Sequence, residues 1–184
     1  MHLRTGDLTL IPSTLLHICT ELETPERLGE LLGATVSPEW PTGEYDRDAM
    51  EFFRTCFEQG GKEVEGWYGW YAVRDPDENS PRTLIGAAGY FGPPDTLGTV
   101  EIGYSVLPEW RCRGYASDMA ELLVKNAFSQ ANVKRAIAHT TLENPASIAV
   151  LIRCGFSAIG PGREPNTICF ERIRAVFPVL HAQS

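Results

Sequence analysis

The stretch of sequence that decides the fold is VEIGYSVLPEW (residues 100–110), followed by RCRGYAS (111–117) and DMAELLVKNAFS (118–129). In the first segment the residues alternate in polarity up to Val106, which is typical of a strand, and Pro108 ends that strand. In the third segment the apolar residues recur with a period of about 3.6, which predicts a helix. The basic segment between them is therefore a turn that joins a strand to a helix.

The composition of this turn indicates an anion site. It contains Arg111-x-x-Gly114-x-Ala116, and small residues let the backbone come close to a ligand. The first amides of the following helix have no partners within that helix, and with the helix dipole they favour a group such as pyrophosphate. A plain strand-to-helix connection with two surface arginines is the alternative. The turn matches neither GxxxxGK[ST] nor GxGxxG, which disfavours a nucleoside-triphosphate loop and a dinucleotide fold.

A second strand and helix follow this turn and helix. Residues 133–141 are expected to form a strand parallel to the first, with a right-handed crossover between the two. Asn144 is expected to cap the next helix, with Pro145 in its first turn and Gly155 just past its end. The apolar residues expected to form the buried stripe of this helix are Ile148, Leu151 and Ile152.

These two segments, in this order and at this separation, resemble the GNAT superfamily of acyl-CoA-dependent N-acyltransferases. The resemblance rests on R-x-x-G-x-A and on N-x-x-S-I-x-x-L-x-x-x-G-F at residues 144–156, and it covers roughly residues 7–173. The strand Glu101–Tyr104, and Leu151 where many relatives carry tyrosine, resemble the branch that includes ribosomal-protein N-terminal acetyltransferases. The resemblance implies an α/β fold with a mixed, twisted, mostly antiparallel sheet flanked by helices. In that fold one parallel strand pair splays apart, and the acyl-pantetheine arm lies in the gap.

The remaining elements are predicted from hydrophobic periodicity and turn residues. Strands are expected at residues 8–11, 67–73, 83–90 and 167–172. The middle two and the strand at 100–106 are joined by short turns, so they should be antiparallel. Helices are expected at residues 13–22, at 24–32, and from Asp46, as the cap, to Gln59.

Length and composition are those of an ordinary globular protein with one domain. The chain has 184 residues, of which 43% are hydrophobic and 22% charged. We expect a single domain over residues 1–184, with its core at about 7–173 and a tail at 174–184. The apolar part of that tail, AVFPVL at 175–180, would cover a sheet edge or join a dimer interface, so the protein is expected to be a monomer or a homodimer.

Charge and cysteine usage limit the partners and the compartment. The net charge of −8 disfavours nucleic acid and would attract a cationic substrate. No apolar run approaches the roughly 20 residues of a membrane span, and the N-terminus lacks the apolar core of a signal peptide. The five cysteines are scattered, with no Cys-x-x-Cys, and the four histidines show no ligand spacing. We therefore expect a cytoplasmic protein with no metal, no nucleic acid and no membrane partner.

The resemblance implies acetyl-CoA as the acyl donor and assigns residues to it. A backbone amide near Ser105 or Val106, at a bulge that family members have in this strand, is expected to stabilise the oxyanion, although ordinary strand pairing is the alternative. Arg111 and Arg113 are expected to face phosphates. Residues expected to contact the cofactor are Ser105, Val106, Arg111, Cys112, Arg113, Gly114, Tyr115, Ala116, Ser117 and Asn144.

Direct acetyl transfer to an amine requires a group that accepts the amine proton. Glu101, on the strand that leads into the turn, is the candidate base, acting directly or through water; the alternative is a solvated strand residue. Ser147 is the nearest hydroxyl that would protonate the leaving thiolate, but a serine in a first helical turn more often caps or faces solvent. Solvent is a further source of that proton. Direct transfer needs no nucleophile, so an acyl-enzyme at Cys112 is not required.

Three functions remain open from the sequence. The acceptor is a protein N-terminal α-amine, or a small amine such as an amino acid, polyamine or antibiotic, or the chain is a non-catalytic acyl-CoA-binding module. The intact Glu101 and the intact turn disfavour the third. The N-terminal helices and the loops around Trp40, Trp67 and Tyr90 would recognise the acceptor, and they carry no recognisable motif. The sequence therefore predicts the chemistry and leaves the acceptor unidentified.

Overall fold

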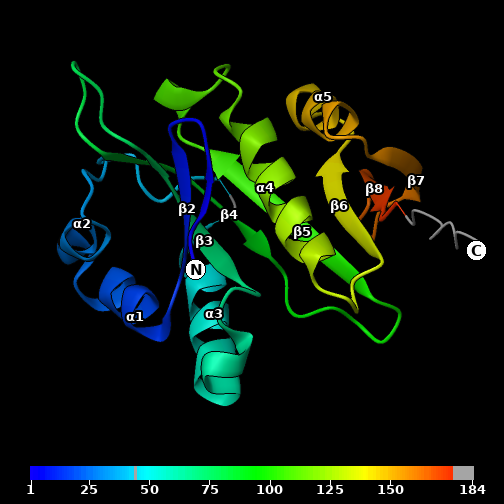
Figure 1. Ribbon diagram of the computed structural model, residues 1–184, viewed down its shortest axis with the longest axis horizontal. Coiled ribbons are helices and arrows are strands. Elements are labelled where there is room, and N and C mark those ends of the chain that lie inside the picture. The colour runs from blue at the N-terminus through cyan, green and yellow to red at the C-terminus, as the bar shows by residue number, and fades with distance from the viewer. Residues whose placement is uncertain (44, 176–184) are drawn as a thin grey trace, which may run out of the picture.

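A single eight-stranded sheet organises the protein. The computed structural model describes residues 1–43 and 45–175, and in this part of the chain the strand order is β1-β2-β3-β4-β5-β6-β8-β7 (Figure 1). The strands are β1 (Leu3–Thr5), β2 (Leu8–Pro12), β3 (Gly69–Arg74), β4 (Thr83–Tyr90), β5 (Thr99–Val106), β6 (Arg135–Thr141), β7 (Ser157–Pro161) and β8 (Thr167–Ile173).

Among the described strands, β5 and β6 form the one parallel pair, and every other neighbouring pair is antiparallel. The chain passes from β3 to β4 and from β4 to β5 by short turns, which suit antiparallel pairing. It passes from β5 to β6 through a helix, which is the length of connection that parallel strands need. The predicted mixed, mostly antiparallel sheet with one parallel pair is therefore confirmed.

Helices cover both faces of this sheet. Figure 1 shows α4 lying across β5, with α1, α2 and α3 gathered near β2 and β3. The helices are α1 (Leu15–Glu23), α2 (Leu28–Leu32), α3 (Arg47–Gly60), α4 (Tyr115–Ser129) and α5 (Pro145–Arg153). Short 3₁₀ turns lie at Pro25–Arg27, Gly61–Val64 and Pro108–Trp110.

The alternation of side chains along β3 separates the two sides of the core. Ala72 packs in the larger cluster with the apolar face of α4, whereas Tyr71 and Val73 pack on the opposite face with α2. Met119 and Leu123 of α4 are fully buried, and burial of such a side chain contributes about 1.5–3 kcal/mol. This packing fixes the beginning of α4 beside the end of β5, where the predicted anion turn lies.

The helix ends follow the predicted capping residues. Asp46 accepts a hydrogen bond from the amide of Ala49 at 3.0 Å, and Asn144 accepts one from the amide of Ser147 at 3.0 Å. Gly155 has a φ of 75°, a left-handed conformation that suits a glycine just past a helix. The predicted boundaries of α3 and α5 are confirmed within about one residue.

Four details differ from the sequence analysis. The helix expected at 24–32 is a 3₁₀ turn followed by the short α2, and the strands β1 and β7 were not predicted. On α5, Ile152 is 60% exposed, and Val150 packs on the core in its place. The bulge expected in β5 is absent from its register with β4. Register shifts lie instead between β3 and β4, at Ala72/Val73, and between β7 and β8, at Ala158/Gly160.

Two further expectations can be compared with the described residues. None of the helices described here is long and apolar enough to cross a membrane. All five cysteines are free thiols. The apolar tail segment expected at 175–180 lies outside the described residues after position 175.

Candidate active site

The site begins where the parallel strands separate. β5 and β6 are paired only from Thr99↔Arg135 to Glu101↔Ile137. β5 stays paired with β4 on its other edge as far as Val106, so from Ile102 onward a gap opens between β5 and β6. The two strands of the crossover therefore diverge toward the end at which α4 begins, as the family resemblance implies.

The hydrogen bonds of β5 show which of its backbone groups face this gap. The Phe91 amide donates to the Glu101 carbonyl at 3.1 Å, and the Leu107 amide donates to the Ile85 carbonyl at 2.9 Å. In an antiparallel ladder every second residue makes such bonds to the partner strand, so Ser105 bonds to β4. The alternate residues of β5 direct their amides and carbonyls toward the gap. Val106 is one of these, and its carbonyl accepts a hydrogen bond from Arg111 Nε at 2.9 Å. Of the two predicted oxyanion donors, the Val106 amide therefore faces the gap.

The turn before α4 has the backbone of an anion site. Gly114 has a φ of 93°, and a Cβ atom built on it would meet nothing within 4 Å. The amides of Ser117 and Asp118 return to the Gly114 carbonyl, at 2.9 and 3.1 Å. The amides of Tyr115 and Ala116 have no hydrogen-bond partner among residues 1–43 and 45–175. Two free amides at the positive end of a 15-residue helix, beside an open glycine, fit a pyrophosphate.

The arginines of the turn are held in place by neighbouring groups. Arg111 is anchored through its Nε, which leaves its terminal nitrogens available, and Arg113 lies over the Trp110 ring at 4.8 Å. Cys112 is exposed and has a φ of 59°, so it makes the sharp bend between them. Arg153, at the end of α5, lines a cavity that begins at this turn, and it was not singled out from the sequence.

One cavity of about 810 Å³ connects this turn with the opposite end of the strand gap. Its walls come from the start of α4, from β5 and β6 on either side of the gap, from the first turns of α5, and from β4 and α3. All ten predicted cofactor residues except Arg113 line it. The residues present therefore fit an acyl-CoA, with its phosphates at the turn and its pantetheine arm along the free edge of β5.

A pair of hydroxyl groups lies inside this cavity. The Tyr104 hydroxyl is 3.2 Å from Ser147 Oγ, and Asn144 caps α5 through the backbone amide of Ser147, so the Ser147 side chain is left for other contacts. Burial raises the pKa of Tyr104 to about 12, which keeps the phenol protonated at neutral pH. Leu151 is fully buried and offers no hydroxyl. Tyr104, which the sequence analysis did not assign, is thus a protonated hydroxyl group next to Ser147 in this cavity.

Glu101 lies in a chain of three polar side chains from three elements. One of its oxygens is 2.7 Å from His139 Nδ1 on β6, and the other is 2.7 Å from Arg163 Nη2 in the β7–β8 connection. The side chains of Glu101 and His139 are 13% and 18% exposed, respectively. Glu101 is therefore a paired, mostly buried carboxylate, and the reading of it as a solvated strand residue does not hold.

Sequence reasoning missed His139 and Arg163. His139 lies two residues beyond the last position at which β6 pairs with β5. Arg163 reaches Glu101 from a turn that forms only when β7 pairs with β8. The signal for His139 was present in the sequence, because a parallel register between the two predicted strands places it near Glu101. No signal of that kind exists for Arg163.

Another part of the cavity has an aromatic lining. Tyr45, Phe53 and Phe91 line it, and Gly43 approaches Ser105 so closely that a Cβ atom would lie 2.3 Å from Ser105 Oγ. This loop follows Trp40, as the sequence analysis expected for the acceptor side. This part of the cavity is therefore walled by Gly43 and Tyr45, which precede α3, with Gly43 in close contact with β5.

A buried carboxylate anchors that loop. Glu21 of α1, 6% exposed, accepts hydrogen bonds from Trp40 Nε1, from the Tyr45 hydroxyl at 2.7 Å and from the Tyr71 hydroxyl at 2.6 Å. Burial raises the pKa of Glu21, and the three donors counteract this rise. Glu21 thus joins the loop to the sheet and fixes the position of Tyr45.

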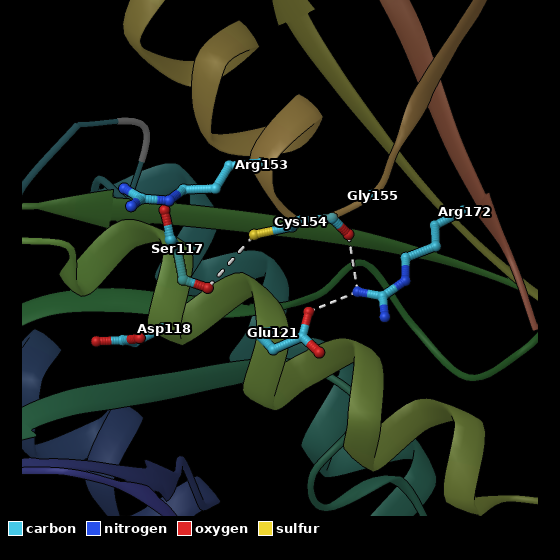
Figure 2. A pocket seen from close by; sticks show the side chains of 7 residues that line it. All are labelled: Ser117, Asp118, Glu121, Arg153, Cys154, Gly155 and Arg172. Atoms are coloured by element: carbon cyan, nitrogen blue, oxygen red, sulfur yellow. Dashed lines mark hydrogen bonds and ion pairs between the residues drawn. The ribbon is translucent and has the colours of Figure 1, made fainter.

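A second, shallower hollow lies behind the turn. Figure 2 shows its lining residues on α4, at the end of α5 and on β8. The volume of this hollow is about 450 Å³. Arg172 crosses it and donates to Glu121 at 2.5 Å and to the Cys154 carbonyl at 2.8 Å. Ser117 and Arg153 line both this hollow and the main cavity, so it is a side extension of the cofactor end.

Within residues 1–43 and 45–175, no group of three or more His, Cys, Asp or Glu side chains is arranged to hold a metal ion.

Comparison of the sequence with known proteins finds acetyltransferases. The model of the acetyltransferase (GNAT) domain matches residues 23–157. The uncharacterized N-acetyltransferase YjdG of Bacillus subtilis is 28% identical over 125 residues, which are 68% of this chain and 71% of that protein.

Solved structures share the fold over nearly the whole chain. An acetyltransferase (GNAT family) from Bacillus anthracis superposes with a TM-score of 0.60 at 17% identity, covering 94% of this chain and 98% of that one. The ribosomal-protein acetyltransferase RimL, solved in complex with coenzyme A, superposes with a TM-score of 0.64 at 14% identity, covering the same 94% and 98%. At these identities the likeness concerns the fold.

Proposed function

The chain belongs to the GNAT acetyltransferase family and is an acetyltransferase; we propose that its donor is acetyl-CoA and its acceptor the α-amine of a polypeptide N-terminus. The observation that supports this most is the single cavity of about 810 Å³. It is lined by the start of α4, by both sides of the β5–β6 gap, by His139, which pairs with Glu101, and by aromatic side chains. Donor and acceptor would enter from opposite ends and meet in the gap.

The donor end supplies binding and charge stabilisation. The amides of Tyr115 and Ala116 and the Arg111 guanidinium would hold the pyrophosphate, with Arg153 beside it. The pantetheine amides would pair with the free edge of β5 as an added strand does. The acetyl carbonyl would then point at the Val106 amide, which would donate to the developing oxyanion.

The middle of the cavity supplies proton transfer. The amine loses a proton toward the Glu101–His139 pair, and the leaving thiolate gains one from Ser147 or from Tyr104 behind it. An α-amine, with a pKa of about 8, loses its proton more readily at neutral pH than a lysine, with a pKa of about 10.4. This difference favours an α-amine as the acceptor.

The acceptor end supports a polypeptide. Its aromatic lining suits an apolar first side chain, and the end is open, because Phe91 is 57% exposed. The exposed rings of Phe52 and Phe91 would contact the residues that follow the first one. RimL, whose fold this chain shares, is a ribosomal-protein N-terminal acetyltransferase.

The experiment is an acceptor comparison with acetyl-CoA, read by thiol release and mass spectrometry. One peptide carries a free N-terminus and no lysine, a second carries a blocked N-terminus and one lysine, and a third set holds amino acids, polyamines and aminoglycosides. We expect acetylation of the first peptide alone, and faster reaction with an apolar first residue than with an acidic one. Acetylation confined to the small amines would overturn the acceptor class and leave the donor assignment intact.

A further inference from the structure

Arg163, Glu101 and His139 form a row of interacting side chains, and Glu101 is not the member of this row that faces the cavity. Both of its oxygens are engaged at 2.7 Å, one by His139 Nδ1 and the other by Arg163 Nη2. His139 lines the cavity, whereas Glu101 is not among the residues that line it. To take a proton from an amine in the cavity, Glu101 would have to leave one of these partners.

The hydrogen bond to Glu101 also determines which nitrogen of His139 is free. A carboxylate only accepts, so in the neutral ring the proton lies on Nδ1 and the lone pair on Nε2. In the described part of the chain, Nε2 has no hydrogen-bond partner. A histidine oriented in this way by a carboxylate presents a basic nitrogen at a fixed position.

Packing fixes the plane of this ring. A Cβ atom on Gly162 would lie 3.0 Å from His139 Cδ2, so the β7–β8 turn that carries Arg163 also lies against the imidazole. Cys169 faces His139 across the β6–β8 ladder. The same Cβ atom would lie 2.1 Å from Thr167 Oγ1, so the turn packs closely against both β8 and the ring.

We propose that His139 takes the amine proton at Nε2 and that Glu101, held by Arg163, acts through His139 as a positioning residue. This assignment rests on the proposed function, because it requires an amine acceptor in the cavity. It adds to that function the group that touches the acceptor. Glu101 remains necessary, and its role changes from base to support of the base.

An acceptor that enters as an ammonium ion gives up two protons in this reaction. His139 Nε2 takes one proton, and the freed nitrogen lone pair forms the N–C bond while the carbonyl electron pair moves to oxygen. The C=O bond forms again, the C–S bond breaks, and its electron pair leaves with sulfur. The second nitrogen proton reaches the thiolate through Ser147 or Tyr104. The products are the amide, the thiol of CoA and one proton, which His139 returns to solvent.

The charges around His139 suit a positive imidazolium. Glu101 contacts it directly, while the Arg163 guanidinium lies on the far side of that carboxylate and is 71% exposed, so solvent screens it. On β8, burial and the nearby Glu101 raise the pKa of the Cys169 thiol, so this neighbour is neutral. Farther along the same ladder, Arg135 and Glu171 form an ion pair at 3.5 Å that neutralises both charges.

The test compares His139→Gln with Glu101→Gln on one acceptor. We expect His139→Gln to lower kcat at neutral pH by a factor on the order of 10²–10⁴, with KM for acetyl-CoA unchanged. Glu101→Gln should lower kcat only about 10-fold, because the glutamine carbonyl still accepts from Nδ1–H. The double variant should be no slower than His139→Gln, because one group acts through the other. The matched control is His2→Gln, the same change at an exposed histidine outside the cavity, which should react like the parent.

Two results would overturn the proposal. One is a His139→Gln protein that turns over like the parent while Glu101→Gln is the slower variant. The other is a double variant whose loss is the product of the two single losses, since independent groups behave in this way.

A second measurement needs neither an acceptor nor a variant that folds. Nitrogen-15 NMR of the parent with labelled imidazoles should show His139 protonated at Nδ1 and bare at Nε2 in the neutral form. A proton on Nε2 would contradict the proposal. If no peptide is acetylated but this tautomer is found, the acceptor class is wrong and the orientation of His139 stands.

Discussion

The two ends of the cavity are built in different ways. Most of the cofactor end is one continuous segment, residues 106–117, in which a strand end, a turn and a helix start follow one another, with Arg153 of α5 beside it. The acceptor end is assembled from segments far apart in the sequence, including Gly43 and Tyr45 before α3, Phe91 after β4 and His139 on β6. A continuous segment carries its own geometry, whereas an assembled one depends on the packing of the whole fold. Substitutions should therefore act locally at the first end and through neighbours at the second.

The largest effect is expected at the cofactor end, from Gly114→Asp. A carboxylate beside the free amides of Tyr115 and Ala116 would occupy the anion site and repel the pyrophosphate. Affinity for CoA, measured by calorimetry, should fall at least 100-fold, while circular dichroism stays that of the parent. The matched control is Gly61→Asp, another left-handed glycine with open space around its Cβ position, which separates backbone strain from charge. Parent-like affinity in Gly114→Asp would show that the turn does not hold the phosphates.

At the acceptor end, Glu21→Ala should act through the loop that Glu21 anchors. The substitution leaves two tyrosine hydroxyls and an indole N–H without their acceptor, and each such loss costs roughly 1–3 kcal/mol. Urea unfolding should show a loss on the order of 3 kcal/mol, and KM for the acceptor should rise while KM for acetyl-CoA holds. Glu23→Ala, an exposed glutamate on the same helix, is the control. A rise in both KM values together would mean that the two ends are not separable in this way.

A smaller effect is expected where the two ends meet. Tyr104→Phe removes the hydroxyl 3.2 Å from Ser147 Oγ, and kcat should fall about 10-fold if the pair protonates the thiolate. Ser147→Ala should cause a similar loss and keep α5 intact, because Asn144 caps it through the backbone amide. Acetyl-CoA binding serves as the control for both. Full activity in both variants would assign the thiolate proton to solvent.

The smallest effect is a dependence of stability on pH at Glu21. Burial raises the pKa of Glu21 in the folded protein, so the native state binds this proton more readily than the unfolded chain. The resulting stabilisation is complete below the ordinary value of 4.5 and is lost as the pH rises through the folded value. Relative to Glu21→Gln, the parent should therefore gain unfolding free energy between pH 7 and pH 5. A difference that stays flat, or falls, as the pH is lowered would contradict the raised pKa.

The same contrast explains what the sequence could predict. The strand–turn–helix segment and the capped α5 follow from periodicity, Gly114, Asn144 and Gly155, all of which act on their immediate neighbours. The parallel pairing of β5 and β6 followed from the length of their connection, whereas the gap between them was expected only from the family resemblance. The shape of the cofactor end was therefore accessible from local rules.

The acceptor end was accessible only in part. Glu101 could be chosen because an acid on a strand beside a cleft is unusual, but its partners depend on the register of β6 and on the β7–β8 turn. Ile152 was assigned to the buried face of α5 because its spacing from Ile148 is helical, yet the helix presents Val150 to the core. Such features arise from tertiary packing, which a periodic pattern does not specify.

The central claim is that cofactor binding and proton transfer belong to different parts of one cavity. The direct measurement is acetyl-CoA affinity and turnover, determined side by side for Gly114→Asp and Glu101→Gln. We predict that Gly114→Asp loses affinity, whereas Glu101→Gln binds like the parent, turns over about 10-fold more slowly at neutral pH, and recovers as the pH rises toward the pKa of the acceptor amine. Affinity lost in both variants, or a Glu101→Gln deficit that persists unchanged at high pH, would contradict this division.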